Sequence, residues 1–131
     1  MKASELRQGN LVNDEDLQPM YIAGIWPVDQ GKRYNFIDSG GNVGNISLLS
    51  PIPLTHEILV KMGFENYQKA FYNFYKIKYT HILPKKPLTI MKFDEGVYNW
   101  MEGNANVHIY YVHQLQNLYF ALTNTELNFT L

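Results

Sequence analysis

Few residues of this 131-residue chain have the types and spacing that catalysis or metal binding requires. Its four histidines are His56, His81, His108 and His113. The last two are five apart, which fits neither the helical zinc pattern nor alternate strand positions, and no acidic residue lies between them. Cysteine is absent, which excludes disulfides, thiolate metal sites and cysteine nucleophiles. We therefore expect no metal and no cofactor.

The acidic and glycine-rich segments are also explained without catalysis. Asp14, Glu15 and Asp16 lack the distal glutamate of a calcium loop, which indicates a solvated loop. The Ser-Gly-Gly-Asn run at 39–42 is not followed by the Lys-Ser/Thr of a phosphate-binding loop, and no serine stands in a Gly-x-Ser-x-Gly elbow. The sequence thus offers no catalytic residues, and we expect a protein that is not an enzyme.

One segment combines basic and aromatic side chains, the combination that single-stranded nucleic-acid binding requires. Its members are Lys76, Lys78, Lys85, Lys86, Tyr72 and Phe74. The competing interpretation is the solvent face of an amphipathic strand. The net charge of −1 favours that interpretation, because nucleic-acid-binding domains are usually basic. Nucleic acid is therefore a partner that the sequence allows but does not favour.

Composition places the chain among globular proteins. Hydrophobic residues make up 46% and aromatic residues 15%, enough for a core and typical of β-structure. No segment has the roughly 20 apolar residues of a membrane helix, and the N-terminus lacks the apolar region of a secretory signal. We expect a cytoplasmic protein with no membrane partner. The sequence does not fix its oligomeric state.

Short strands separated by turns are predicted for residues 1–52. Residues 33–38 alternate in hydropathy, and the 39–42 run predicts a hairpin loop. Gly24 lies inside a strand-like segment, which predicts a bulge or a bend. Four or five such strands predict a small SH3-like β-barrel.

The second half begins with a short linking helix near residues 55–62. Thr55 is a good N-cap, and Gly63 fits the left-handed position that ends a helix. Strands predicted at 75–80, 88–93, 97–101 and 107–111 form an antiparallel meander. The expected fold is therefore α+β, with a barrel at 1–52 and a sheet with two helices at 53–131, packed as one compact unit.

A C-terminal helix is predicted near residues 112–122. Leu115, Leu118, Tyr119 and Leu122 recur at helical spacing and predict a buried stripe. The opposite side carries His113, Gln116, Asn117 and Phe120. A large aromatic side chain among polar residues needs a second surface to cover it, either the N-terminal barrel, which we favour, or another copy of the protein. These four residues therefore form a candidate interaction surface.

Three stretches resemble an uncharacterised family of small proteins from Bacteroidetes genomes and their phages and prophages. They are Glu-Leu-Arg-Gln-Gly-Asn-Leu-Val at 5–12, Pro-Ile-Pro-Leu-Thr at 51–55 with Met-Gly-Phe at 62–64, and Val-His-Gln-Leu-Gln-Asn-Leu-Tyr-Phe-Ala-Leu-Thr at 112–123. Members continue the last stretch with Gly-Glu-Glu-Leu, where this chain has Asn-Thr-Glu-Leu. Residues 65–106 show no resemblance. The resemblance implies a cytoplasmic accessory protein of mobile-element origin and assigns no functional residue.

Together these observations predict a small non-enzymatic interaction module with an unknown protein partner. The alternative is a single-stranded nucleic-acid-binding protein that uses the lysine-aromatic strand.

Overall fold

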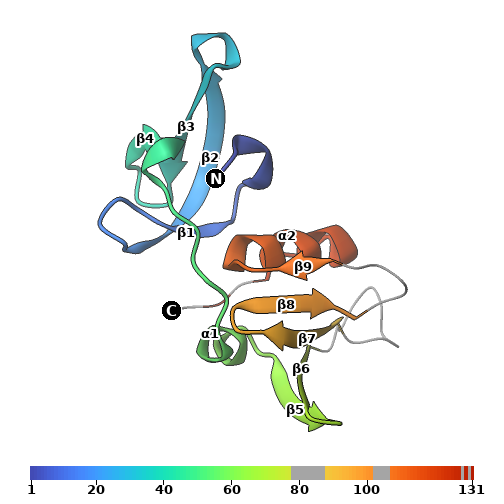
Figure 1. Cartoon of the computed structure of the whole chain (residues 1–131). Helices are drawn as coiled ribbons and strands as arrows, with labels where there is room; N and C mark the ends of the chain where they lie inside the picture. Colours follow the sequence, from blue (N-terminus) through green and yellow to red (C-terminus); the bar gives the residue numbers. More distant parts are fainter. Residues whose placement is uncertain (78–87, 102–106, 128, 130) are drawn as a thin grey trace. The chain divides into compact units, whose positions relative to one another are not determined.

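The computed structural model describes residues 1–77, 88–101, 107–127, 129 and 131 and contains two antiparallel sheets and two α-helices (Figure 1). The fold is therefore α+β, as the sequence predicts. By their internal contacts the residues form two units. The first unit is Met1–Ile52 with Tyr111–Asn117, and the second is Pro53–Tyr110 with Leu118–Leu131. The sequence assigned 111–117 to the second half, whereas the structure groups this segment with the first unit.

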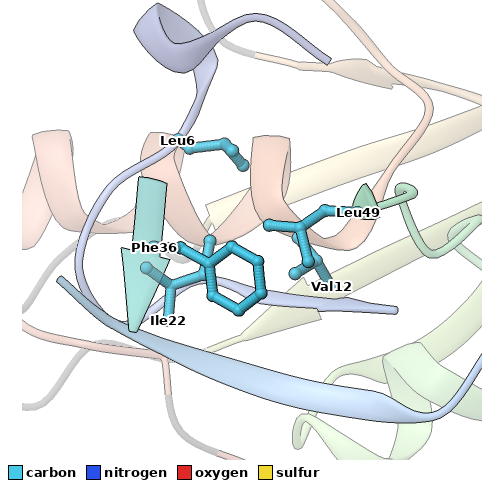
Figure 2. Packing of buried hydrophobic residues seen from close by; sticks show 5 residues of the cluster. All are labelled: Leu6, Val12, Ile22, Phe36 and Leu49. Atoms are coloured by element: carbon cyan, nitrogen blue, oxygen red, sulfur yellow. The ribbon is translucent and has the colours of Figure 1, made fainter. Parts of the chain in front are cut away.

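The first unit contains a four-stranded antiparallel meander with the order β1-β2-β3-β4. Its strands are β1 (Leu11–Asn13), β2 (Pro19–Val28), β3 (Arg33–Asp38) and β4 (Val43–Asn45), with short 3-10 helices at Ala3–Glu5, Asp29–Gly31 and Ile46–Leu48. The pairing of β2 with β3 shifts register between Ile22 and Gly24, which confirms the predicted bulge. Leu6, Val12, Ile22, Phe36 and Leu49 form the core of this sheet (Figure 2).

The second unit contains a five-stranded antiparallel meander with the order β5-β6-β7-β8-β9. Its elements are α1 (His56–Lys61), β5 (Glu65–Lys69), β6 (Tyr72–Ile77), β7 (Leu88–Asp94), β8 (Val97–Trp100) and β9 (His108–Ile109). The sequence missed β5, because all five of its residues are exposed and show no apolar alternation. The predicted strand at 75–80 lies within β6 as far as Ile77, and its remainder is outside the described residues.

Local sequence determines both ends of α1. The Thr55 hydroxyl accepts a hydrogen bond from Ile58 N at 3.2 Å, which confirms the predicted cap. At the other end Phe64 N donates to Leu59 O, Gly63 N donates to Val60 O, and Gly63 has a φ of 99°. This is a Schellman motif, and it uses the left-handed glycine that the sequence predicts.

The remaining helix, α2 (Val112–Thr123), contributes its first half to one unit and its second half to the other. Leu115 is fully buried as predicted, whereas Leu118, Tyr119 and Leu122 are only half-buried. Among the described residues, neither helix is long and apolar enough to cross a membrane.

Candidate functional site

The polar side of α2 is largely covered by other residues of the same chain. His113 and Gln116 are each only 1% exposed. Asn117 and Phe120 are half-buried, and Phe120 falls in the second unit, apart from the other three. His113 and Gln116 are therefore covered by other residues of the chain, and the candidate interaction surface stays a prediction. Periodicity identified the side of the helix that carries polar groups, but it could not show that the same chain covers them.

Gln116 binds the main chain at the start of β1. Its Oε1 accepts a hydrogen bond from Leu11 N at 2.8 Å, and its Nε2 donates to Gly9 O at 3.2 Å. A primary amide can pair with a peptide N–H and C=O in the way that a neighbouring strand would. The side chain thus satisfies two main-chain groups that would otherwise need partners in a buried environment.

Asn117 extends this contact to the N-terminal segment. Its Oδ1 accepts from Asn10 Nδ2 at 2.8 Å and from Arg7 Nε at 3.2 Å, while its Nδ2 donates to Glu5 O at 2.9 Å. Asn117 and Gln116 together attach the first half of α2 to residues 5–11. The polar residues of this helix side are therefore used within the first unit.

His113 differs from its polar neighbours, because neither ring nitrogen has a hydrogen-bond partner in the described structure. The ring lies nearly parallel to Tyr111, with 5.9 Å between ring centroids. Burial lowers the pKa of His113, partly opposed by the negative charge of Glu5, while the terminal amino group lowers the pKa further. The imidazole is thus neutral in the folded protein at neutral pH.

Acidification is expected to destabilise the protein through His113. The folded-state pKa is lowered, so the unfolded chain binds a proton first. The stability that neutral His113 contributes is complete above the unfolded-state pKa of about 6.5 and is lost as the pH falls below it. The free energy of unfolding then decreases by up to about 1.4 kcal/mol per pH unit. Urea unfolding between about pH 7 and pH 5 measures this slope.

Two variants isolate the histidine responsible. His113→Leu should have a shallower pH dependence than the wild type, because its side chain cannot take up a proton. His108→Gln, which changes an exposed histidine, should retain the wild-type slope. Equal slopes for His113→Leu and the wild type would show that His113 does not control acid stability.

The other histidines of the described chain make separate contacts. His56 Nδ1 lies 2.9 Å from the Tyr75 hydroxyl, and His108 contacts the Asn99 side chain. His81 lies outside the described residues. Within the described part of the chain, no group of three or more His, Asp or Glu side chains could hold a metal ion.

The second sheet has one buried and one accessible face. On β6, Tyr75 is 2% exposed and makes an edge-to-face contact with Tyr98, with 5.9 Å between ring centroids. Tyr72, Phe74 and Lys76 alternate with this buried position and therefore share the opposite face. These are three of the six residues of the predicted nucleic-acid surface. The other three, Lys78, Lys85 and Lys86, lie outside the described residues.

Cross-strand pairing adds Tyr67 and Lys69 of β5 to this face. Tyr67 is directly opposite Phe74, and their rings stack with 5.3 Å between centroids and an interplanar angle of 14°. Lys76 Nζ lies 5.2 Å from the centroid of the Tyr67 ring, within cation–π range. Two aromatic rings and an ammonium group thus form one contiguous cluster.

The same face continues across β7 to β9. Met91 pairs with Phe74 and with Asn99, which pairs with His108. Phe93 contacts the His108 ring, with 6.3 Å between centroids. We call this surface the open face: Tyr67, Lys69, Tyr72, Phe74, Lys76, Met91, Phe93 and His108.

Three open-face rings are substantially exposed: Tyr67 at 36%, Tyr72 at 52% and Phe93 at 60%. Sequence reasoning found Tyr72 but missed Tyr67 and Phe93. The alternation in β6 was the available signal for this face, whereas the contributions of β5 and β7 depend on strand register.

Comparisons with protein-family models, curated proteins and solved structures gave no match to this chain.

Proposed function

We propose that this protein is a non-enzymatic binding module whose open face binds single-stranded nucleic acid. The observation that carries this proposal is the stacked Tyr67–Phe74 pair beside Lys76 on an accessible sheet face. Every base has an aromatic surface that can stack on such rings, and lysines pair with the phosphates between bases. The bases of a duplex are already stacked on one another, so the proposed ligand is unpaired.

Stacking supplies more of the expected affinity than charge does. Among the eight open-face residues only Lys69 and Lys76 are lysines, and the acidic Glu65, which pairs opposite Lys76, lies on the same side of the sheet. Two neutralised phosphates predict a slope of about −1.4 in a plot of log affinity against log salt. Raising salt from about 50 to about 200 mM should then weaken binding only about sevenfold.

Removing one open-face ring should weaken binding strongly. Tyr67→Ala removes a ring from an exposed strand, so the fold should tolerate the change. Loss of one stacked base costs about 1–3 kcal/mol, which raises the Kd about 5- to 150-fold. The measurement is fluorescence anisotropy with labelled oligo-dT and oligo-rU 12-mers.

Matched variants separate the open face from general effects. Tyr67→Phe keeps the ring and should bind like the wild type. Lys69→Gln should weaken binding, whereas Lys32→Gln changes an exposed lysine of the first unit and should not. The proposal would be contradicted if a 12-bp duplex bound as tightly as the single-stranded 12-mers. It would also be contradicted if no binding occurred at about 100 µM protein, which is the weak end of non-specific affinities.

We also propose that the first sheet is a small SH3-like barrel. In support, Asn13 of β1 bridges Ser50, which follows β4 and the 3-10 helix at Ile46–Leu48. Asn13 N donates to Ser50 O at 2.9 Å, and Ser50 N donates to Asn13 O at 3.0 Å. This contact joins the first strand to the segment after the last, as closure of a barrel requires.

The proposed cellular role is that of a cytoplasmic accessory protein of phage or mobile-element origin. The resemblance described above supports it. Two of its three stretches, 5–12 and 112–123, are joined in the structure by the hydrogen bonds of Gln116 and Asn117. The genes that flank this one are the direct test, since phage structural or replication genes should adjoin it.

A further inference from the structure

The first unit has a groove that the proposed function does not use. Its volume is about 340 Å³, at the lower end of the range for ligand sites. The groove lies between the loop after β1, the β3–β4 hairpin and the 3-10 helix at Ile46–Leu48. A space of this size accepts one or two side chains of a bound segment, not a folded domain.

One side of this groove is strongly acidic. Asp14, Glu15, Asp16 and Asp38 contribute four carboxylates, and none of the residues that line the groove is basic. Two of these carboxylates are held in place. Asp14 Oδ1 accepts from the main-chain N of Asp16 at 2.8 Å, and Asp38 Oδ1 accepts from that of Asn42 at 2.8 Å.

The charge of Asp38 is maintained near neutral pH. Hydrogen bonds, chiefly from the Asn42 side chain, lower the pKa of Asp38. Glu15 and Asp16 are exposed at the rim. The acidic side chains of the groove are therefore accessible to a bound segment at the rim, and Asp38 is held by hydrogen bonds beside them.

The other side of the groove is apolar. Phe36 and Leu49 belong to the buried core, whereas Val43 is 60% and Leu48 44% exposed. Gly44 allows the chain to pass close to Phe36, because a Cβ at this position would lie 3.0 Å from the Phe36 ring. Exposed aliphatic side chains thus adjoin four carboxylates.

We propose that this groove binds an extended peptide segment of a partner protein in which arginine or lysine alternates with large aliphatic residues. Charge complementarity selects the basic residues, and Val43 and Leu48 supply an apolar contact for the aliphatic ones. Alternate side chains of an extended peptide point to opposite sides, so one segment can present both kinds to the groove. Nucleic acid is not a suitable occupant, because the carboxylates repel phosphate.

The probes for this proposal are three capped hexapeptides, which alternate Leu with Arg, Leu with Glu, and Ser with Arg. Each is titrated into the ¹⁵N-labelled full chain while amide chemical shifts are recorded. The Leu-Arg peptide should shift the amides of Val43, Gly44 and Leu48 in a saturable manner. The Leu-Glu peptide should not bind, and the Ser-Arg peptide should bind more weakly.

Variants assign the binding to the groove. The double change Glu15→Gln with Asp16→Asn should lower the affinity for the Leu-Arg peptide about three- to tenfold, as expected for the loss of two exposed charge pairs. Leu48→Ser should also lower the affinity for this peptide, because it removes an exposed aliphatic side chain from the groove. Glu57→Gln with Glu65→Gln removes the same charge from the second unit and should leave the affinity unchanged.

Three results would overturn the proposal. They are equal binding of the Leu-Glu peptide, shifts confined to the second unit, and equal weakening by both charge-removing double variants. Peptide binding is assigned by the amides of Val43, Gly44 and Leu48 in the first unit, whereas nucleic-acid binding is assigned by variants of the second sheet, so the two proposals can fail independently.

Discussion

Leu115→Ala is expected to lower the free energy of unfolding by about 2–5 kcal/mol, the range for truncation of a buried leucine. Leu115 is 0% exposed, and it is the one member of the predicted helix stripe that is fully buried. The change removes apolar contacts and leaves a cavity that the surrounding side chains can fill only in part. Urea denaturation monitored by tryptophan fluorescence and circular dichroism measures the loss.

The matched control is another leucine-to-alanine change at an exposed position. Leu17 is 69% exposed, so Leu17→Ala should change stability by less than about 0.5 kcal/mol. If Leu115→Ala were no more destabilising than this control, the assignment of Leu115 to the core would be wrong. Leu118→Ala should fall between the two, because Leu118 is half-buried.

Gln116→Glu is expected to destabilise the protein by about 2–4 kcal/mol at neutral pH, although the two side chains have nearly the same shape. The wild-type Nε2 donates to Gly9 O at 3.2 Å. In the variant an ionised carboxylate oxygen would face this carbonyl oxygen in a site that is 1% exposed. The folded protein can avoid the clash by protonating the glutamate, which from a reference pKa of about 4.3 costs about 3.7 kcal/mol at pH 7.

The sign of the pH dependence makes this prediction specific. The folded-state pKa of the introduced glutamate is raised, so the folded protein retains a proton that the unfolded chain releases. The deficit relative to wild type should therefore shrink as the pH falls and be small near pH 4. Measuring both proteins at each pH removes the contribution of His113, which they share.

Gln114→Glu is the control for Gln116→Glu, on the same helix. The Gln114 Oε1 accepts from Tyr111 N at 3.1 Å, a role that a carboxylate can keep, and the helix dipole favours negative charge in the first turn. We expect a change below about 1 kcal/mol. A Gln116→Glu deficit that did not depend on pH would show that the loss is not electrostatic.

Local sequence was sufficient to predict the features whose structure depends on residues close together in the chain. The cap at Thr55 and the left-handed glycine at Gly63 were both predicted, because each is determined by hydrogen bonds within a few residues. The register shift beside Gly24 was also predicted, because a glycine inside a strand is itself a local signal. Strand alternation likewise identified the buried and accessible sides of β6.

The composition of the open face depended on strand register. Tyr67 lies in a strand with no apolar alternation, and only its pairing opposite Phe74 places it beside Lys76. Phe93 and His108 are 15 residues apart in the chain, and they meet because β7, β8 and β9 pair in sequence. Residue types alone carry no information on such cross-strand neighbours.

The sequence by itself determined the α+β class, the short capped helix and the polar side of α2. Only the tertiary structure decided what that polar side does. A helical pattern shows that His113, Gln116 and Asn117 share one side, and water is the default partner for such groups. Here residues 5–11 supply the partners of Gln116 and Asn117 instead, from more than 100 positions away in the chain. No local rule anticipates this, because a buried amide is stable wherever its hydrogen bonds are satisfied, and only the fold brings those partners within reach.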